Sequence, residues 1–199
     1  MRDPVPLGAV PVPLGWELAP IDWEYGDGTL RVAAGPRTDL FADPRADSAV
    51  VNAPRLLGPV EGDFVFSARV RMGFAATYDA GALLAWVDDR CWGKLCLEYS
   101  PQPEPMIVSV VTRDRSDDAN AFVTVDRAWL RIARLGSAYA FHASTDGMVW
   151  QFVRYFALPD GAAARIGFAA QSPTGDGCTV WFDEITYRAE RLADLRDGS

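Results

Sequence analysis

Residues 80–99 read Ala-Gly-Ala-Leu-Leu-Ala-Trp-Val-Asp-Asp-Arg-Cys-Trp-Gly-Lys-Leu-Cys-Leu-Glu-Tyr, and this stretch decides the fold class. Two strand-like runs, 81–88 and 91–99, are joined by Asp88-Asp89-Arg90, as in a hairpin loop. Side chains alternate across a strand, so Leu95, Leu97 and Tyr99 should face a core. The stretch predicts an antiparallel hairpin with one buried face.

Similar runs continue on both sides of this hairpin. They are 28–33, 63–72, 106–113, 120–125, 128–135, 138–144, 149–157, 164–171 and 178–187. Asp146-Gly147 marks another turn, because Gly takes positive φ without steric cost. An apolar 3.6-residue period is absent before the tail 189–199, which could form a short helix or fray. The pattern predicts an all-β protein, a two-sheet antiparallel sandwich.

The length and composition agree with one domain that has a large core. The chain has 199 residues, of which 49% are hydrophobic, and we expect a single domain over 1–199 with a Pro-rich extended arm over 1–20. Six large apolar residues should lie buried between the sheets: Phe64, Phe66, Leu95, Leu97, Phe168 and Phe182.

Charge and cysteine content exclude several classes of partner. The net charge of -8 and the lack of a basic stripe argue against nucleic acid, and no apolar run is long enough for a membrane span or a secretory signal. Cys91 and Cys96 point to opposite faces of one strand, so reduced thiols, also at Cys178, and a cytoplasmic location are expected. His142 is the only histidine, so no His-based catalytic triad or multi-His metal site is predicted, and no cofactor.

The second face of residues 91–99 is polar. It carries Trp92, Lys94, Cys96 and Glu98. Lys94 is the single lysine beside 18 arginines, and it lies about 13 Å from Glu98 along a strand, too far for a relaxed ion pair. With a tight 88–91 turn, Lys94 would lie opposite Ala85 and Glu98 opposite Gly81. Small residues opposite long polar ones would leave a groove.

Other residues could complete this groove. Tyr78 and Asp79 should lie beside Glu98, and 106–113 should contribute Ser109 or Thr112, since these two point to opposite faces. Two interpretations remain open. Lys94 and Glu98 could belong to a partly buried, mutually satisfied network, or they could line a groove for a small polar ligand.

Two other groups of residues have possible roles. Asp114, Asp117 and Asp118 could offer oxygens to Ca²⁺, although a solvated turn is the favoured interpretation. Arg131 and Arg154 fall within apolar strands and would need carboxylate partners, for which Glu98 and Asp79 are candidates.

Several segments together resemble the DUF1349 family, which is labelled "regulation of enolase". The matching segments are 38–41, 63–66, 78–83, 92–98, 109–113, 116–118, 144–147 and 171–173. The resemblance implies a concanavalin A-like jelly roll, a fold in which sugars usually bind the concave sheet face. Many members carry Gln and Trp where this chain has Ala80 and Asp118.

These observations favour a domain that binds a carbohydrate or another small polar ligand. The expected ligand-binding residues are Tyr78, Asp79, Trp92, Lys94, Glu98, Ser109, Thr112 and Gln171. A protein-interaction domain is the first alternative, and a glycoside hydrolase using Glu98 and Asp79 is the second. Concanavalin A-like glucanases carry Glu-x-Asp-x-x-Glu on one strand, and this string is missing, so no catalytic residue is predicted.

Overall fold

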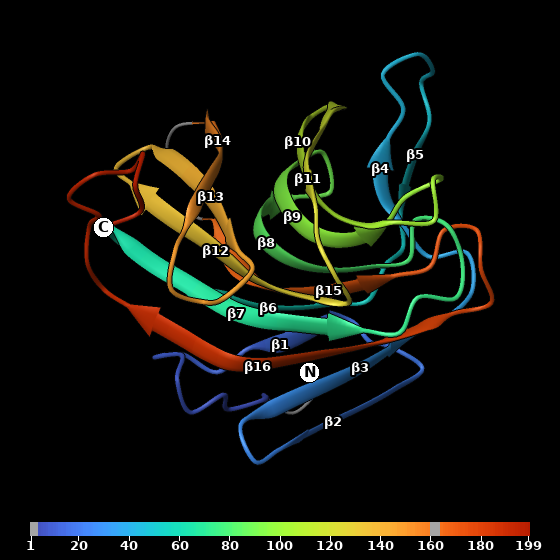
Figure 1. Cartoon of the computed structure of the whole chain (residues 1–199), viewed down its shortest axis with the longest axis horizontal. Coiled ribbons are helices and arrows are strands. Elements are labelled where there is room, and N and C mark those ends of the chain that lie inside the picture. The colour runs from blue at the N-terminus through green and yellow to red at the C-terminus, as the bar shows by residue number, and fades with distance from the viewer. Residues whose placement is uncertain (1–3, 160–163) are drawn as a thin grey trace.

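The computed structural model describes residues 4–159 and 164–199, and in these ranges it contains strands and no helix. Two seven-stranded antiparallel sheets pack face to face, with a separate short hairpin beside the first sheet (Figure 1). This arrangement confirms the predicted all-β, two-sheet sandwich.

The first sheet carries the most curved strands in Figure 1, β8 to β10. In spatial order it consists of β1 Gly15–Leu18, β6 Arg55–Pro59, β15 Arg165–Gln171, β8 Ala80–Asp88, β9 Cys91–Tyr99, β10 Pro105–Arg113 and β11 Arg115–Val123. The short hairpin consists of β4 Leu40–Ala42 and β5 Ala49–Val51.

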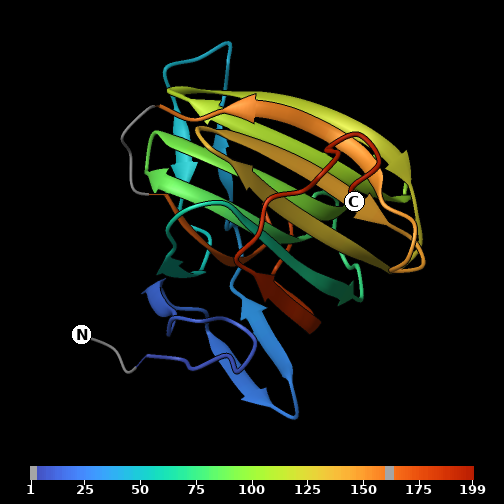
Figure 2. The ribbon, with the colours of Figure 1, turned by 90° about the vertical axis from the view of Figure 1, so that its left-hand side faces the viewer.

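The second sheet contains the N-terminal strands β2 and β3 and the C-terminal strand β16. In spatial order it consists of β14 Gln151–Ala157, β13 Ala138–Ser144, β12 Arg127–Leu135, β7 Phe64–Met72, β16 Cys178–Arg188, β3 Thr29–Ala34 and β2 Asp22–Gly26. Turning the molecule shows β2 and β3 at one end, near the N-terminal segment (Figure 2).

The main hydrophobic core lies between the sheets, as alternation predicts. All six residues expected there are fully buried: Phe64, Phe66, Leu95, Leu97, Phe168 and Phe182. The N-terminal arm also takes part, because Val5, Leu7, Val10 and Leu14 are buried in the same core. The arm is therefore packed into the sandwich rather than only laid along it.

Each sheet also buries part of its outer face under a covering segment. Hairpin β4–β5 covers Trp86, Trp92 and other apolar residues of the first sheet. The C-terminal tail covers the second sheet, where Leu192 packs against Val65. The tail contains turns and no helix, so its apolar side chains are buried without helical periodicity.

The register of the central hairpin differs from the expectation by one residue. Lys94 pairs with Leu84 and Glu98 with Ala80, instead of with Ala85 and Gly81. A register shift between Trp86 and Asp88 adds one residue to β8 near the turn, which moves every later pair. The turn itself is tight, as expected, because Asp88 pairs with Cys91. The expected partners of Lys94 and Glu98 are wrong because of the extra residue in β8.

Strand boundaries also differ from the sequence-based ranges. The five short strands β1, β2, β4, β5 and β6 were not expected, and of the expected strand 120–125 only residues 120–123 are in a strand, as the end of the longer β11. All three cysteines are buried and unpaired, which confirms the expected free thiols. Among the described residues, no helix is long and apolar enough to cross a membrane.

Candidate functional site

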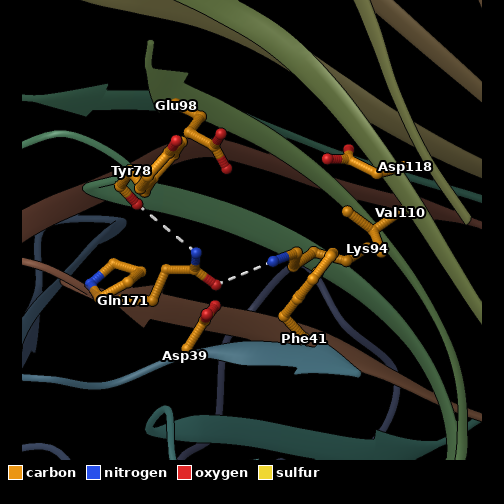
Figure 3. Close-up of a pocket in the computed structure, with 9 residues that line it drawn as sticks. Asp39, Phe41, Tyr78, Lys94, Glu98, Val110, Asp118 and Gln171 are labelled. Atoms are coloured by element: carbon orange, nitrogen blue, oxygen red, sulfur yellow. Dashed lines mark hydrogen bonds between the residues drawn. The ribbon is translucent and has the colours of Figure 1, made fainter. Parts of the chain in front are cut away.

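A cavity of about 300 Å³ opens on the outer face of the first sheet, where hairpin β4–β5 meets the sheet (Figure 3). We call it the Lys94 pocket. Its lining residues are Asp39, Phe41, Tyr78, Lys94, Glu98, Val110, Asp118, Gln171 and Pro173. They come from segments far apart in the sequence, so only the folded chain brings them together.

Strand pairing explains why polar side chains converge here. Lys94 pairs with Val110 on β10, and Val110 pairs with Asp118 on β11, so these three side chains share one face. Ala80 on β8 pairs with both Glu98 and Gln171. Its small side chain leaves open space between the carboxylate and the amide.

Lys94 is the most buried polar residue that lines the pocket, with 2% of its surface exposed. Its ammonium donates hydrogen bonds to the Leu40 carbonyl (3.0 Å) and to Oε1 of Gln171 (2.9 Å). The Gln171 amide in turn donates to the Tyr78 carbonyl (3.5 Å). An ammonium has three N–H groups, so one remains for another acceptor. Lys94 therefore ties hairpin β4–β5 to the sheet and retains one donor.

Three carboxylates surround this single ammonium. Burial lowers the pKa of Lys94, but Cys96 and the negative charges of Asp39, Glu98 and Asp118 raise it, and the net pKa lies above its ordinary value. The carboxylates compensate the buried charge without touching it, since no ion pair joins Lys94 to any described residue within 4.0 Å. Glu98 and Lys94 therefore form no direct ion pair, as their spacing along the strand predicted, while Lys94 belongs to a buried hydrogen-bond network with Leu40 and Gln171.

The carboxylates themselves have shifted proton affinities. Burial raises the pKa of Glu98 to about 7, against the opposing effect of Lys94. Burial also raises the pKa of Asp39 and Asp118, although Asp118 is the more exposed of the two, so solvent screens its shift more strongly. Near neutral pH Glu98 is present in both protonation states, so it can donate or accept a hydrogen bond.

Tyr78 carries backbone strain at the pocket rim. Its φ angle is 70°, a left-handed conformation that costs free energy for a bulky residue, and its side chain is 41% exposed. The conformation is held by the hydrogen bond that the Tyr78 backbone N–H donates to the Tyr99 carbonyl (2.7 Å) and by the bond from Gln171 to the Tyr78 carbonyl. Strain of this kind is typical of functional sites.

Asp79 does not line the pocket, although the sequence suggested that it would lie beside Glu98. Its carboxylate is fully buried and accepts hydrogen bonds from the Ser172 hydroxyl (2.6 Å) and from the backbone of Ala75 and Ala76. Asp79 thus organises the loops around the pocket. It is not positioned to act with Glu98 as a second catalytic carboxylate.

The expected roles of Trp92, Ser109 and Thr112 also need correction. Trp92 is fully buried and stacks on Trp86 with ring centroids 5.1 Å apart, so it offers no exposed sugar platform. Thr112 shares the face of Lys94 but bonds to Ser116 (2.8 Å) outside the pocket. Ser109 pairs with Leu95, so it points to the opposite face.

The aromatic and acidic residues that sequence analysis missed come mostly from segments without a clear period. The missed residues are Asp39, which precedes β4, Phe41 and Asp118, whereas Tyr78 was expected at this pocket. Asp39 and Phe41 lie in one of the segments that resemble the family, and Asp118 replaces its usual Trp. Both signals were available but did not indicate a shared cavity.

The remaining charged candidates have other partners. Arg154 pairs with Asp117 (2.9 Å) and Asp114 with Arg90 (2.6 Å). The three aspartates considered for Ca²⁺ therefore face different neighbours, and no acidic cluster suited to a metal lies within the described ranges. Arg131 has no carboxylate partner there, contrary to expectation.

Solved structures with the same fold come from proteins of different kinds. A functionally unknown protein from Saccharomyces cerevisiae superimposes with a TM-score of 0.83 at 23% identity, covering 90% of this chain and 97% of that one. A GH43 protein from Bacillus licheniformis gives a TM-score of 0.70 at 16% identity, covering 88% of this chain and 36% of that one. This chain thus spans about a third of the GH43 protein.

A third structure is the carbohydrate-binding module CBM66 from Bacillus subtilis. It gives a TM-score of 0.51 at 11% identity, covering 87% of this chain and 95% of that one. At such low identities the three likenesses establish the fold alone, a jelly-roll β-sandwich of the concanavalin A-like kind.

Sequence comparison assigns a family but no activity. A search of curated protein sequences finds no match. The family model described as "Protein of unknown function (DUF1349)" matches residues 16–190, which include every residue of the Lys94 pocket. The chain therefore belongs to the DUF1349 family.

Proposed function

We propose that this protein binds a small neutral carbohydrate in the Lys94 pocket. The observation that carries this proposal is the buried ammonium of Lys94, which keeps one free N–H inside a cavity that also contains three carboxylates. Donors and acceptors of this kind, held at fixed positions, suit hydroxyl groups, because each hydroxyl both donates and accepts.

The size and lining of the pocket support a sugar as the ligand. A cavity of about 300 Å³ lies at the lower end of the range for small-molecule sites. Phe41 and Tyr78 provide apolar surface for the carbon face of a sugar ring, while Glu98 and Asp118 can accept from its hydroxyls. Glu98 has no hydrogen-bond partner among the described residues, so it is available to a ligand.

The comparisons support the proposal only through the fold. One structure with this fold is a carbohydrate-binding module, and others are named as glycoside hydrolases. The cytoplasmic location remains a prediction, for which three buried free thiols are the supporting observation.

Calorimetric titration with a panel of neutral mono- and disaccharides tests the proposal. Glu98→Ala should weaken binding of the best sugar by about tenfold or more, because a charge-assisted hydrogen bond is lost. The matched control is Glu104→Ala, an exposed glutamate outside the pocket, which should bind as the parent does. The proposal is wrong if no neutral sugar saturates the parent protein, or if both variants lose binding equally.

Glycan cleavage is not part of the proposed function. Asp79 is buried and engaged in the loops, which leaves Glu98 without the partner considered from sequence. We expect no release of reducing sugar from xylan or from β-glucan. Cleavage that Glu98→Gln abolishes without a change in melting temperature would contradict this expectation.

A further inference from the structure

A second cavity of about 300 Å³ lies on the outer face of the second sheet. Its lining residues are Ser67, Trp129, Arg131, Gly147, Trp150, Glu184, Thr186 and Arg188. Arg131 pairs with Ser67, and Ser67 pairs with Thr186, so these three form a row across β12, β7 and β16. Arg188 lies two residues beyond Thr186 and shares its face.

Arg131 is a buried cation without a counter-ion. It is 7% exposed, and no ion pair joins it to any residue in ranges 4–159 and 164–199. Its guanidinium lies 3.6 Å from the centroid of Trp150, and Nη1 donates to the Gly198 carbonyl (2.6 Å). Nε is buried and has no hydrogen-bond partner. The unused donors are therefore on the Nε–Nη2 edge, which can hold a carboxylate through two parallel hydrogen bonds.

The nearby carboxylates are already engaged by other arginines. Asp183 pairs with Arg69 (2.6 Å) and Arg71 (3.0 Å). Glu184 pairs with Arg69 (2.8 Å) and also accepts from Trp129 Nε1 (2.7 Å). Glu190, whose charge raises the pKa of Arg131, is paired with Arg188 (3.1 Å). Arg131 therefore has no carboxylate in direct contact within the described ranges, in a protein whose net charge is -8.

Two further groups around Arg131 favour an anion. The Ser67 and Thr186 hydroxyls share one hydrogen bond (2.8 Å), so the second hydroxyl proton is available to another acceptor. Arg188 lies nearby, and its one ion pair within the described part of the chain is with Glu190 (3.1 Å), a half-exposed contact that contributes little to stability. Burial and the charge of Arg188 lower the pKa of Arg131 to about 10, although the charge of Glu190 raises it. A bound anion would also favour the charged guanidinium.

We propose that this cavity binds the carboxylate of a small organic ligand, held side-on by the Nε–Nη2 edge of Arg131 and assisted by Arg188. Nε is closed to water, so binding requires a small shift of a covering side chain, and Trp150, which is part-exposed and lies against the guanidinium, is the candidate. The indole rings of Trp129 and Trp150 would flank the body of the ligand, which favours a ring-shaped acid over a simple one.

Titration with four probes tests this site: D-glucuronate, acetate, inorganic phosphate and D-glucose. Binding is followed by the indole N–H resonances of Trp129 and Trp150, which report on this cavity and not on the Lys94 pocket. D-glucuronate should bind saturably and more tightly than acetate, while D-glucose, which lacks the carboxylate, should not shift these resonances. Arg131→Met and Arg131→Lys should each weaken glucuronate binding by about tenfold or more. Neither methionine nor lysine has the planar pair of N–H donors with which a guanidinium binds a carboxylate.

The matched control is Arg71→Met, which removes an arginine from the same sheet but outside the cavity lining, and it should bind as the parent does. If loss of the Gly198 contact unfolds the Arg131 variants, Arg188→Met, at an exposed position, should still weaken binding severalfold. An equal loss of glucuronate binding in Arg71→Met would contradict the assignment of this cavity as the binding site. Binding of phosphate but not of glucuronate, or equal shifts with D-glucose, would overturn the carboxylate assignment.

Discussion

The outer faces of the two sheets use a buried cation in the same way but compensate it differently. On the first sheet Lys94 donates to the Leu40 carbonyl of hairpin β4–β5, and on the second Arg131 donates to the Gly198 carbonyl of the tail. Three carboxylates surround Lys94, whereas Arg131 lies against an aromatic ring and forms no ion pair in the described ranges. Burial of a charge costs free energy that counter-charges offset. The comparison indicates that Lys94 stabilises its sheet and that Arg131 contributes little.

The largest difference should appear when Lys94 is removed. Lys94→Met leaves three carboxylates without their cation and breaks two hydrogen bonds, so the free energy of unfolding should fall by about 3 kcal/mol at pH 8. The loss should shrink at pH 5, where the carboxylates with raised pKa bind protons. Urea unfolding at both pH values measures the effect. Equal free energies of unfolding for variant and parent at pH 8 would contradict the claim that Lys94 stabilises its sheet.

Glu98 should show an intermediate effect that depends on pH. Its pKa is about 7 in the folded protein and 4.5 when unfolded, so between these values the folded state binds more protons. The stability of the parent should therefore fall as pH rises through this window. Glu98→Gln does not titrate, so its stability relative to the parent should increase by about 1–3 kcal/mol between pH 4 and pH 8. Parallel pH profiles of the two proteins would show that Glu98 is not buried as described.

The smallest effect is expected at Arg131. Arg131→Met should change the free energy of unfolding by about 1 kcal/mol or less, since the lost contacts to Gly198 and Trp150 are offset by removal of an unpaired buried charge. The control is Arg154→Met, because Arg154 is paired with Asp117 and should cost more. Thermal unfolding in buffer without carboxylates compares the two. A large loss of stability in Arg131→Met would show that Arg131 stabilises its sheet as strongly as Lys94 does.

The predictability of the site follows the regularity of its strands. Alternation along residues 91–99 correctly assigned Lys94 and Glu98 to one face and Leu95 and Leu97 to the core. It failed for Trp92, because a residue on the correct face can still be covered by another segment. Alternation identifies a face but does not show what lies on it.

The sequence by itself determined the fold class, the core and the polar face of β9, because these depend on local periodicity and composition. Only the tertiary structure decided the register of β8 with β9, since a one-residue shift near Trp86 leaves the pattern of each strand unchanged. It also decided that Leu40 and Gln171, distant in sequence, supply the acceptors of Lys94. The tertiary structure also decided that Arg131 has no ion pair, because strand order determines which side chains lie beside it. No local sequence pattern predicts that strand order.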